Sequence, residues 1–299
     1  EDEDEEVSDM SEYVITINST SDLPKEWVWE REIPVVPLNC TIGGKTYRDM
    51  YDLTAEEFYG MLENGEMAVT SQPSPQTAID ILEPILKKGK DILHLSFTSG
   101  LSGTYNSMCI AAEELREKYP ERKLVVIDSL CSSSGYGLLV DSAADLRDQG
   151  KSLEEVEQWV LAHRNRVHHQ FFSSDMTQFR RTGRVSGAAA TVATVLNICP
   201  IMRLDDKGAI KAYSKVRGKK KAVETTVNVM EQHAQGGRDY DQRCFVCHSR
   251  CPEDAALLIT ALEERFPHLK GKIRLCDIGT IIGSHAGPGT VAVFFYGNE

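Results

Sequence analysis

The sequence predicts an α/β protein of two domains, and three observations support that prediction. The chain has 299 residues, which is enough to bury two hydrophobic cores. Over residues 13–167, strand-like and helix-like runs alternate through short turns, which favours a parallel sheet covered by helices. Over residues 168–299, a hairpin implies a mixed sheet. We therefore expect an N-terminal three-layer α/β/α domain with a parallel sheet (13–167) and a C-terminal two-layer α/β domain with a mixed sheet (168–299).

In the first domain, apolar runs bounded by turn residues predict strands at residues 13–17, 33–38, 91–97 and 123–128. Amphipathic runs predict helices at residues 54–65, 74–89, 101–119, 132–149 and 152–167. Two of these helices begin with a capping box, in which a hydroxyl and a glutamate three residues later satisfy the first backbone N–H groups. The pairs are Thr54 with Glu57 and Ser152 with Glu155.

In the second domain, strands are expected at residues 168–174, 198–204, 209–216, 244–247, 272–277 and 290–295. Helices are expected just before residue 182 and at residues 186–196, 219–235 and 252–266. The turn at residues 205–208 reads Asp-Asp-Lys-Gly and joins two strands into the hairpin. We place the domain boundary near Val167.

Charge is distributed unevenly along the chain. Residues 1–12 contain eight acids and no base, so most of the net charge of −12 lies in a head that we expect to be solvated and disordered. Residues 180–221 instead carry eleven bases against two acids. This basic stretch is either a mixed surface in which bases happen to cluster or a docking face for an anionic partner or ligand. Nucleic-acid binding is disfavoured, because the stretch has few aromatics and the whole chain is acidic.

The eight cysteines indicate a reducing compartment, because their scatter over a long chain is unlike a disulfide framework. We expect a cytoplasmic protein without a transmembrane segment, since no apolar run reaches about 20 residues. Residues Cys244 to His248 match the haem-attachment pattern C-x-x-C-H. We favour a core strand there, because β-forming residues separate the two thiols and should point them to opposite faces. We expect no metal and no cofactor.

Hydroxyl side chains gather in four segments, at least three of which follow an apolar run and precede a helix. The segments are residues 18–22, 70–74, 96–104 and 128–134. In a parallel sheet, such turns bring hydroxyls and free backbone N–H groups together beside helix N-termini. This pattern predicts an anion site without fixed positive charge, suited to a phosphate or a carboxylate.

The motifs of common enzymes are missing. No G-x-S-x-G elbow, Walker A sequence or G-x-G-x-x-G turn occurs, which argues against a serine hydrolase, an ATP site and a dinucleotide site. Residues 283–289 form a glycine-rich segment around His285, which we expect to be a loop whose imidazole donates to an anion. A stand-alone hydrolase or phosphoryl-transfer enzyme using the Ser/Thr clusters and His285 remains the alternative function.

Six short motifs, taken together and in this order, resemble the DegV family of fatty-acid-binding proteins, which in some bacteria are subunits of fatty acid kinase. The motifs lie at residues 18–24, 70–75, 96–105, 182–186, 216–218 and 282–289. The resemblance extends along nearly the whole chain from Tyr13. It implies a carrier, and not an enzyme, that encloses one long-chain fatty acid in an apolar tunnel between the two domains.

The resemblance also implies roles for particular residues. Thr70, Thr98 and Ser99 would bind the carboxylate of the fatty acid, with His285 as a nearby donor. Ser71, Arg184 and Arg217 would contact the head group or a partner. That partner would be an ATP-dependent fatty acid kinase, which would phosphorylate the presented carboxylate to an acyl-phosphate.

Overall fold

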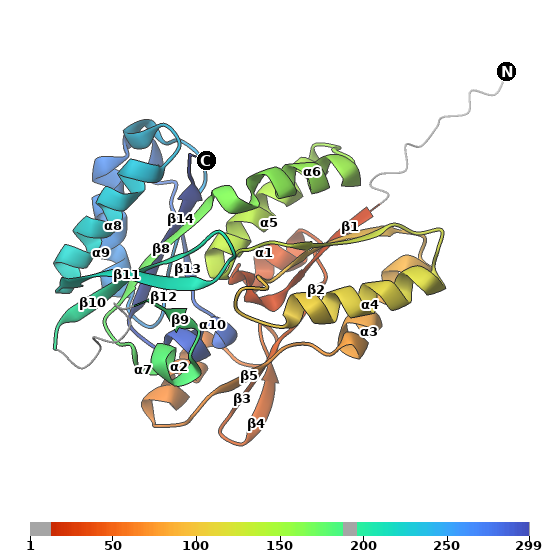
Figure 1. Ribbon diagram of the computed structural model, residues 1–299, viewed down its shortest axis with the longest axis horizontal. Helices are drawn as coiled ribbons and strands as arrows, with labels where there is room; N and C mark the ends of the chain where they lie inside the picture. The colour runs from red at the N-terminus through yellow and green to blue at the C-terminus, as the bar shows by residue number, and fades with distance from the viewer. Residues whose placement is uncertain (1–12, 188–195, 299) are drawn as a thin grey trace.

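Residues 13–187 and 196–298 are described by the computed structural model (Figure 1). The acidic head at residues 1–12 and most of the helix expected at residues 186–196 lie outside these ranges. Where the described chain enters that expected helix, residues Val185–Ser186 form a short strand, β9. None of the described helices combines the length and the apolar character needed to cross a membrane.

A four-stranded parallel sheet organises the first part of the chain. Its order is β2 (Val35–Val36), β1 (Tyr13–Asn18), β6 (Asp91–Ser96) and β7 (Leu124–Asp128). Alternate residues of a strand face opposite sides. Ile92 packs under α3 (Pro75–Lys87) and α4 (Thr104–Lys118), whereas Leu93 joins the larger core that contains α5 (Ser133–Asp148) and α6 (Leu153–His163). The predicted parallel sheet covered by helices is confirmed.

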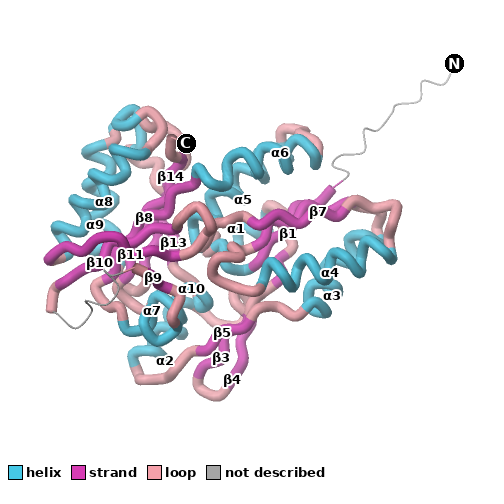
Figure 2. Tube along the Cα trace, in the orientation of Figure 1, coloured by secondary structure: helices cyan, strands magenta, loops and turns pink. Residues whose placement is uncertain are grey.

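A small antiparallel sheet, which the sequence analysis did not foresee, lies beside the parallel sheet. It contains β4 (Lys45–Arg48), β3 (Asn39–Ile42) and β5 (Val69–Ser71), and α2 (Ala55–Glu63) lies between β4 and β5 in the chain. Figure 2 shows these three strands set apart from the larger sheets. The second hydroxyl segment therefore begins on a strand of this sheet, and not at the end of a parallel strand.

The second part of the chain forms the predicted mixed sheet, with seven strands. Their order is β13 (Arg274–Asp277), β12 (Cys244–His248), β14 (Thr290–Tyr296), β8 (Val167–Ser173), β10 (Ile198–Leu204), β11 (Ile210–Arg217) and β9. Helices α8 (Lys219–His233) and α9 (Pro252–Arg265) pack on one face. The C-x-x-C-H sequence is a fully buried strand, as expected. All eight cysteines are free thiols.

The helix α5 lies between the two large sheets, and its residues 133–144 are all buried. A helix buried on every side must also satisfy its polar side chains internally. The hydroxyl of Tyr136 donates to the carbonyl of Leu95 and accepts from the N–H of Asn18, both on the parallel sheet. Ser142 bonds to Tyr296 on the mixed sheet at 2.6 Å. The helix therefore ties the two sheets together.

The remaining helical segments are short. They are η1 (Ser19–Ser21), α1 (Lys25–Glu30), η2 (Arg164–Arg166), α7 (Thr177–Thr182), η4 (Gly237–Asp239), η5 (Pro267–Leu269) and α10 (Thr280–Ala286). The last of these corrects one expectation, because His285 lies in α10 and not in a loop. Gly287 follows the helix with a φ of 66°, a left-handed value that glycine adopts without strain.

Candidate functional site

A cavity of about 360 Å³ opens between the two parts of the chain, within the range of small-molecule sites. Its walls come from the mixed sheet, from β5 of the small sheet, from the loops that follow β2 and β6, and from α7 and α10. Most of the lining side chains are apolar, among them Leu38, Phe97, Leu101, Phe171, Phe179, Leu204, Ile210, Ile281 and Phe294. Such a lining suits a long apolar ligand, because removing that ligand from water is favourable over its whole length.

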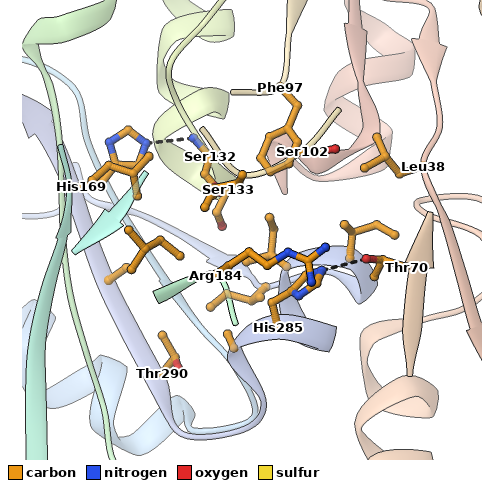
Figure 3. Close-up of a pocket in the computed structure, with 18 of the residues that line it drawn as sticks. Leu38, Thr70, Phe97, Ser102, Ser132, Ser133, His169, Arg184, His285 and Thr290 are labelled. Atoms are coloured by element: carbon orange, nitrogen blue, oxygen red, sulfur yellow. Dashed lines mark hydrogen bonds between the residues drawn. The ribbon is translucent and has the colours of Figure 1, made fainter. Parts of the chain in front are cut away.

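One end of the cavity is polar. Thr70 reaches it from β5, and His285 reaches it from α10 (Figure 3). The hydroxyl oxygen of Thr70 and Nε2 of His285 are 2.8 Å apart and share a hydrogen bond. Two of the residues expected from the resemblance are thus brought together from positions 215 residues apart in the chain.

His285 is held neutral at this site. Burial, with a smaller contribution from the positive charges of Arg184 and Arg181, lowers its pKa to about 4. Its Nδ1 atom is buried and has no hydrogen-bond partner among the described residues. If Nε2–H donates to Thr70, the threonine O–H is free to donate. If Thr70 donates to Nε2, the proton resides on Nδ1 and that N–H is free. Either tautomer leaves one donor for a ligand.

Two arginines place positive charge beside this pair, and the larger effect on His285 comes from Arg184. It lines the cavity, and Figure 3 shows its side chain passing over His285 toward Thr70. One guanidinium nitrogen donates to the carbonyl of Thr182 at 2.8 Å. Arg181, in the short helix α7 that precedes Arg184, donates to the carbonyls of Ala68 at 2.7 Å and Ser284 at 3.4 Å. Arg181 thereby joins the residue before β5 to α10. This link helps to set the distance between Thr70 and His285.

Further polar groups at the cavity are Ser71, Gln72 and Ser102. Ser102 precedes α4, where its hydroxyl accepts from the N–H of Thr104 at 3.1 Å. Ser102 belongs to the hydroxyl segment at residues 96–104, but the family resemblance does not single it out as a binding residue. Its place just before a helix that follows a strand was the available signal, because free N–H groups and hydroxyls there suit an anion.

Thr98 and Ser99, although expected to bind the carboxylate, do not line this cavity. The hydroxyl of Thr98 is fully buried and donates to the carbonyl of Gly208 at 2.9 Å. The N–H of Ser99 donates to Asp128 at 3.1 Å. Arg217 ends β11 with an exposed side chain and also lies outside the lining. Of the expected residues, the cavity lining includes Thr70, Ser71, Arg184 and His285. It does not include Thr98, Ser99 or Arg217.

The opposite end of the cavity carries His169, Ser132 and Ser133 (Figure 3). The N–H of Ser132 donates to Nε2 of His169 at 3.0 Å. Burial lowers the pKa of His169 to about 4, so this imidazole is also neutral. The hydroxyl of Ser133 donates to a carboxyl oxygen of Asp22 at 2.5 Å.

Two chemistries need to be compared at this site, anion binding and nucleophilic catalysis. Thr70 and His285 have the spacing of a nucleophile and a base. However, a base in such a pair is oriented by a third group, and Nδ1 of His285 has no partner among the described residues. Nowhere in the described ranges do three His, Cys, Asp or Glu side chains gather in a way that could hold a metal ion.

Comparison with known proteins gives a consistent family assignment. A family model described as "Uncharacterised protein, DegV family" matches residues 12–298. A DegV domain-containing protein of Clostridium perfringens is 38% identical over 291 residues, which cover 97% of this chain and 99% of that relative. A second relative, from Caldanaerobacter subterraneus, is 32% identical over 295 residues, with coverages of 96% and 99%.

Solved structures with the same fold include three whose descriptions name a fatty acid. A fatty-acid-binding DegV family protein from Thermus thermophilus is 29% identical, with a TM-score of 0.84 and coverages of 96% and 99%. DegV from Bacillus subtilis, described as a fatty acid binding protein, is 26% identical, with a TM-score of 0.81 and coverages of 96% and 99%. A Ruminococcus gnavus protein with vaccenic acid is 25% identical, with a TM-score of 0.83 and coverages of 96% and 100%.

Proposed function

Because the chain belongs to the DegV family, we propose that it binds one long-chain fatty acid in the cavity and presents the carboxylate to a partner kinase. The observation that carries the binding proposal is an apolar cavity with one polar end, at Thr70 and His285. Each buried CH2 group contributes about 0.8 kcal/mol, so a long acyl chain supplies most of the affinity. The fatty acids named for similar structures agree with this lining.

The carboxylate is placed at the Thr70 end because hydrogen-bond donors converge there. A buried carboxylate without partners would be costly, and each donor that faces it lowers that cost. Thr70 and His285 offer one free donor in either tautomer, while Ser71 and Ser102 add hydroxyls. Arg184 adds a positive charge on the same side. Neutral donors with one guanidinium hold an anion and still allow its release.

The role of a partner kinase rests on the family resemblance and on the basic stretch. The kinase would transfer the γ-phosphoryl group of ATP to the presented carboxylate and form an acyl-phosphate. Arg184 lines the cavity at its polar end, and Arg217 lies exposed at the end of β11. We assign Arg184 to the head group and Arg217 to contact with the kinase.

The binding proposal is tested by extracting the purified protein and identifying its lipid by mass spectrometry. Near one fatty acid per chain is expected. Thr70→Val keeps the shape of the side chain and removes its hydroxyl. We expect it to weaken fatty-acid affinity about 10- to 100-fold, as the loss of one hydrogen bond to a charged group predicts. Thr177→Val is the matched control, because Thr177 is exposed and does not line the cavity. A wild-type protein that takes up no long-chain acid would overturn the proposal.

The kinase proposal is tested separately with Arg217→Ala. Acyl-phosphate formation with a cognate kinase is expected to fall, while the fatty-acid content of the variant stays at the wild-type level. Lys215→Ala, on the same strand and also exposed, controls for the loss of one positive charge. Equal turnover by wild type and Arg217→Ala would remove Arg217 from kinase contact without touching the binding proposal.

A further inference from the structure

A second and larger hollow, of about 650 Å³, lies on the mixed sheet beside the C-terminal part of α8. We call it the β8–β11 groove, after the strands β8, β10 and β11 that form its floor. His233 of α8 and Arg164 of η2 contribute to its sides. The groove touches the acyl cavity only through His169 and Leu204, which line both. Its other lining residues are not used by the proposed fatty-acid site.

The strand register places a row of nitrogen donors across the groove floor. Arg203 of β10 is directly opposite Gln170 of β8 and also directly opposite Lys211 of β11. Residues opposite each other on neighbouring strands share a face, about 5 Å apart. All three side chains line the groove. An amide, a guanidinium and an ammonium group therefore stand side by side.

The nitrogen donors of this row have no acceptor among the described residues. Neither Arg203 nor Lys211 forms an ion pair with any residue in the described part of the chain. Like charges directly opposite on adjacent strands are destabilising. The hydroxyl of Tyr213 donates to Oε1 of Gln170 at 2.9 Å, which leaves the amide nitrogen buried and unpartnered. Gln170 is 3% exposed, so water replaces this missing partner poorly.

A further nitrogen donor and several aromatic rings surround the row. The guanidinium of Arg203 lies over the ring of Tyr213, 5.8 Å from its centre. Nε of Arg164 is a second buried donor without a partner among the described residues. The ring centres of His168 and His233 are 5.4 Å apart. Burial, with smaller contributions from the neighbouring His233 and Arg203, lowers the pKa of His168 to about 4.

Two carboxylates also line the groove, Asp205 and Asp206. One oxygen of Asp205 accepts from the N–H groups of Lys207 and Ala209, both at 3.0 Å, and so stabilises the turn between β10 and β11. Neither aspartate forms an ion pair with Arg203 or Lys211. The row of donors is therefore left for a ligand that brings its own acceptors.

We propose that the β8–β11 groove binds a small phosphate-bearing molecule, whose oxygens accept from Gln170, Arg203 and Lys211. A phosphate group has three or more acceptor oxygens and a negative charge, which match three adjacent donors and two cations. Tyr213 and the imidazoles offer flat surfaces to the rest of such a molecule. The proposal does not depend on the fatty-acid site, because the three donors lie outside the acyl cavity.

The test measures binding of inorganic phosphate to the full protein by calorimetry, with sodium chloride at equal ionic strength as reference. Saturable binding by the wild type is expected. Arg203→Gln and Lys211→Gln should each weaken it by about tenfold or more, as expected for one lost charge-assisted hydrogen bond. Lys215→Gln removes the same charge on the same strand outside the groove and should leave the affinity unchanged. The fatty-acid content of all variants should match the wild type.

Three outcomes would overturn the proposal. They are heat from phosphate no larger than from chloride, an equal loss in Lys215→Gln, and phosphate affinity retained in both groove variants. Binding of the wild type to vesicles of anionic phospholipid without binding of inorganic phosphate would also overturn it, in favour of a lipid surface. Circular dichroism of each variant separates a lost site from a lost fold.

Discussion

At the scale of single residues, the protein keeps several buried histidines neutral. His94 and His169 are at most 4% exposed, and His285 is largely buried. Burial disfavours the charged imidazolium, so the pKa of His94 falls to about 3 and those of the other two to about 4. Each ring has at least one polar partner in the fold. Neutral imidazoles can form these bonds at physiological pH without a buried charge.

This depression of pKa predicts how stability depends on pH. Below about pH 6.5 the unfolded chain takes up protons on its histidines, whereas the folded chain does not until far lower pH. The stability contributed by neutral His94 is therefore complete above pH 6.5. It is lost by about 1.4 kcal/mol per pH unit as the pH falls toward 3.

The measurement compares urea unfolding of wild type and His94→Gln at pH 7.5 and pH 5.0. Glutamine keeps polar atoms near Thr16 and Asn18 but does not titrate. The stability difference between the two proteins should shrink by about 2 kcal/mol at the lower pH. Unfolding curves that shift in parallel would contradict a neutral His94. The other titrating groups are common to both proteins and cancel in the difference.

At the scale of elements, the turn between β10 and β11 meets the loop after β6 through their backbones. A Cβ added to Gly100 would lie 2.5 Å from the backbone of Gly208, and one added to Gly208 would lie 2.0 Å from the Thr98 hydroxyl. Gly208 also has a φ of 73°, a backbone angle that residues other than glycine rarely adopt. The hydroxyl of Thr98 closes this junction by donating to the Gly208 carbonyl.

This junction gives Thr98 a structural role that can be separated from ligand binding. Thr98→Val keeps the shape of the side chain but leaves the buried Gly208 carbonyl unpaired, which should cost about 1–3 kcal/mol of stability. The fatty-acid affinity of the folded variant should stay within about twofold of the wild type. Chemical denaturation and a fatty-acid titration measure the two effects. Thr46→Val on exposed β4 is the control. A normal stability with a lost affinity would restore Thr98 as a carboxylate ligand.

At the scale of the whole molecule, the cavity proposed for the fatty acid lies where the two parts of the chain meet. Leu38 and Phe97 line it from one side, and Phe171 and Phe294 line it from the other. A bound fatty acid would therefore add apolar contacts to the mixed sheet and to the loops that follow β2 and β6 of the parallel sheet at once. Helix α5 already joins these sheets through hydrogen bonds, so the ligand adds to an existing connection.

Removal of the ligand should lower the thermal stability of the whole protein. A ligand that binds only the folded state stabilises it by about 2.7 kcal/mol at a free concentration of 100 Kd. Calorimetry of extracted protein should show a lower Tm than protein reloaded with a long-chain acid. Octanoic acid should restore less of the difference, because fewer CH2 groups are buried. Equal Tm values for stripped and reloaded protein would contradict binding at this cavity.

The sequence by itself determined the class of fold and the positions of most strands and helices. Periodic apolar runs, capping boxes and the hairpin at residues 205–208 are local signals, and each is read within a few residues. The same locality explains why the C-x-x-C-H segment predicts a core strand, which the structure confirms. The six motifs of the family extended this to an expectation of fatty-acid binding, with Thr70, Ser71, Arg184 and His285 among the residues expected at the site.

Only the tertiary structure decided which hydroxyls face the cavity and which serve the fold. Thr98 and Ser102 lie four residues apart in one loop, yet one is tied to Gly208 and the other lines the cavity. Local sequence patterns also did not predict the small sheet that contains Thr70 or the helix that contains His285. These outcomes depend on contacts between residues more than a hundred positions apart, such as Thr70 with His285. Short-range sequence patterns do not encode such contacts, because the packing of distant segments determines them.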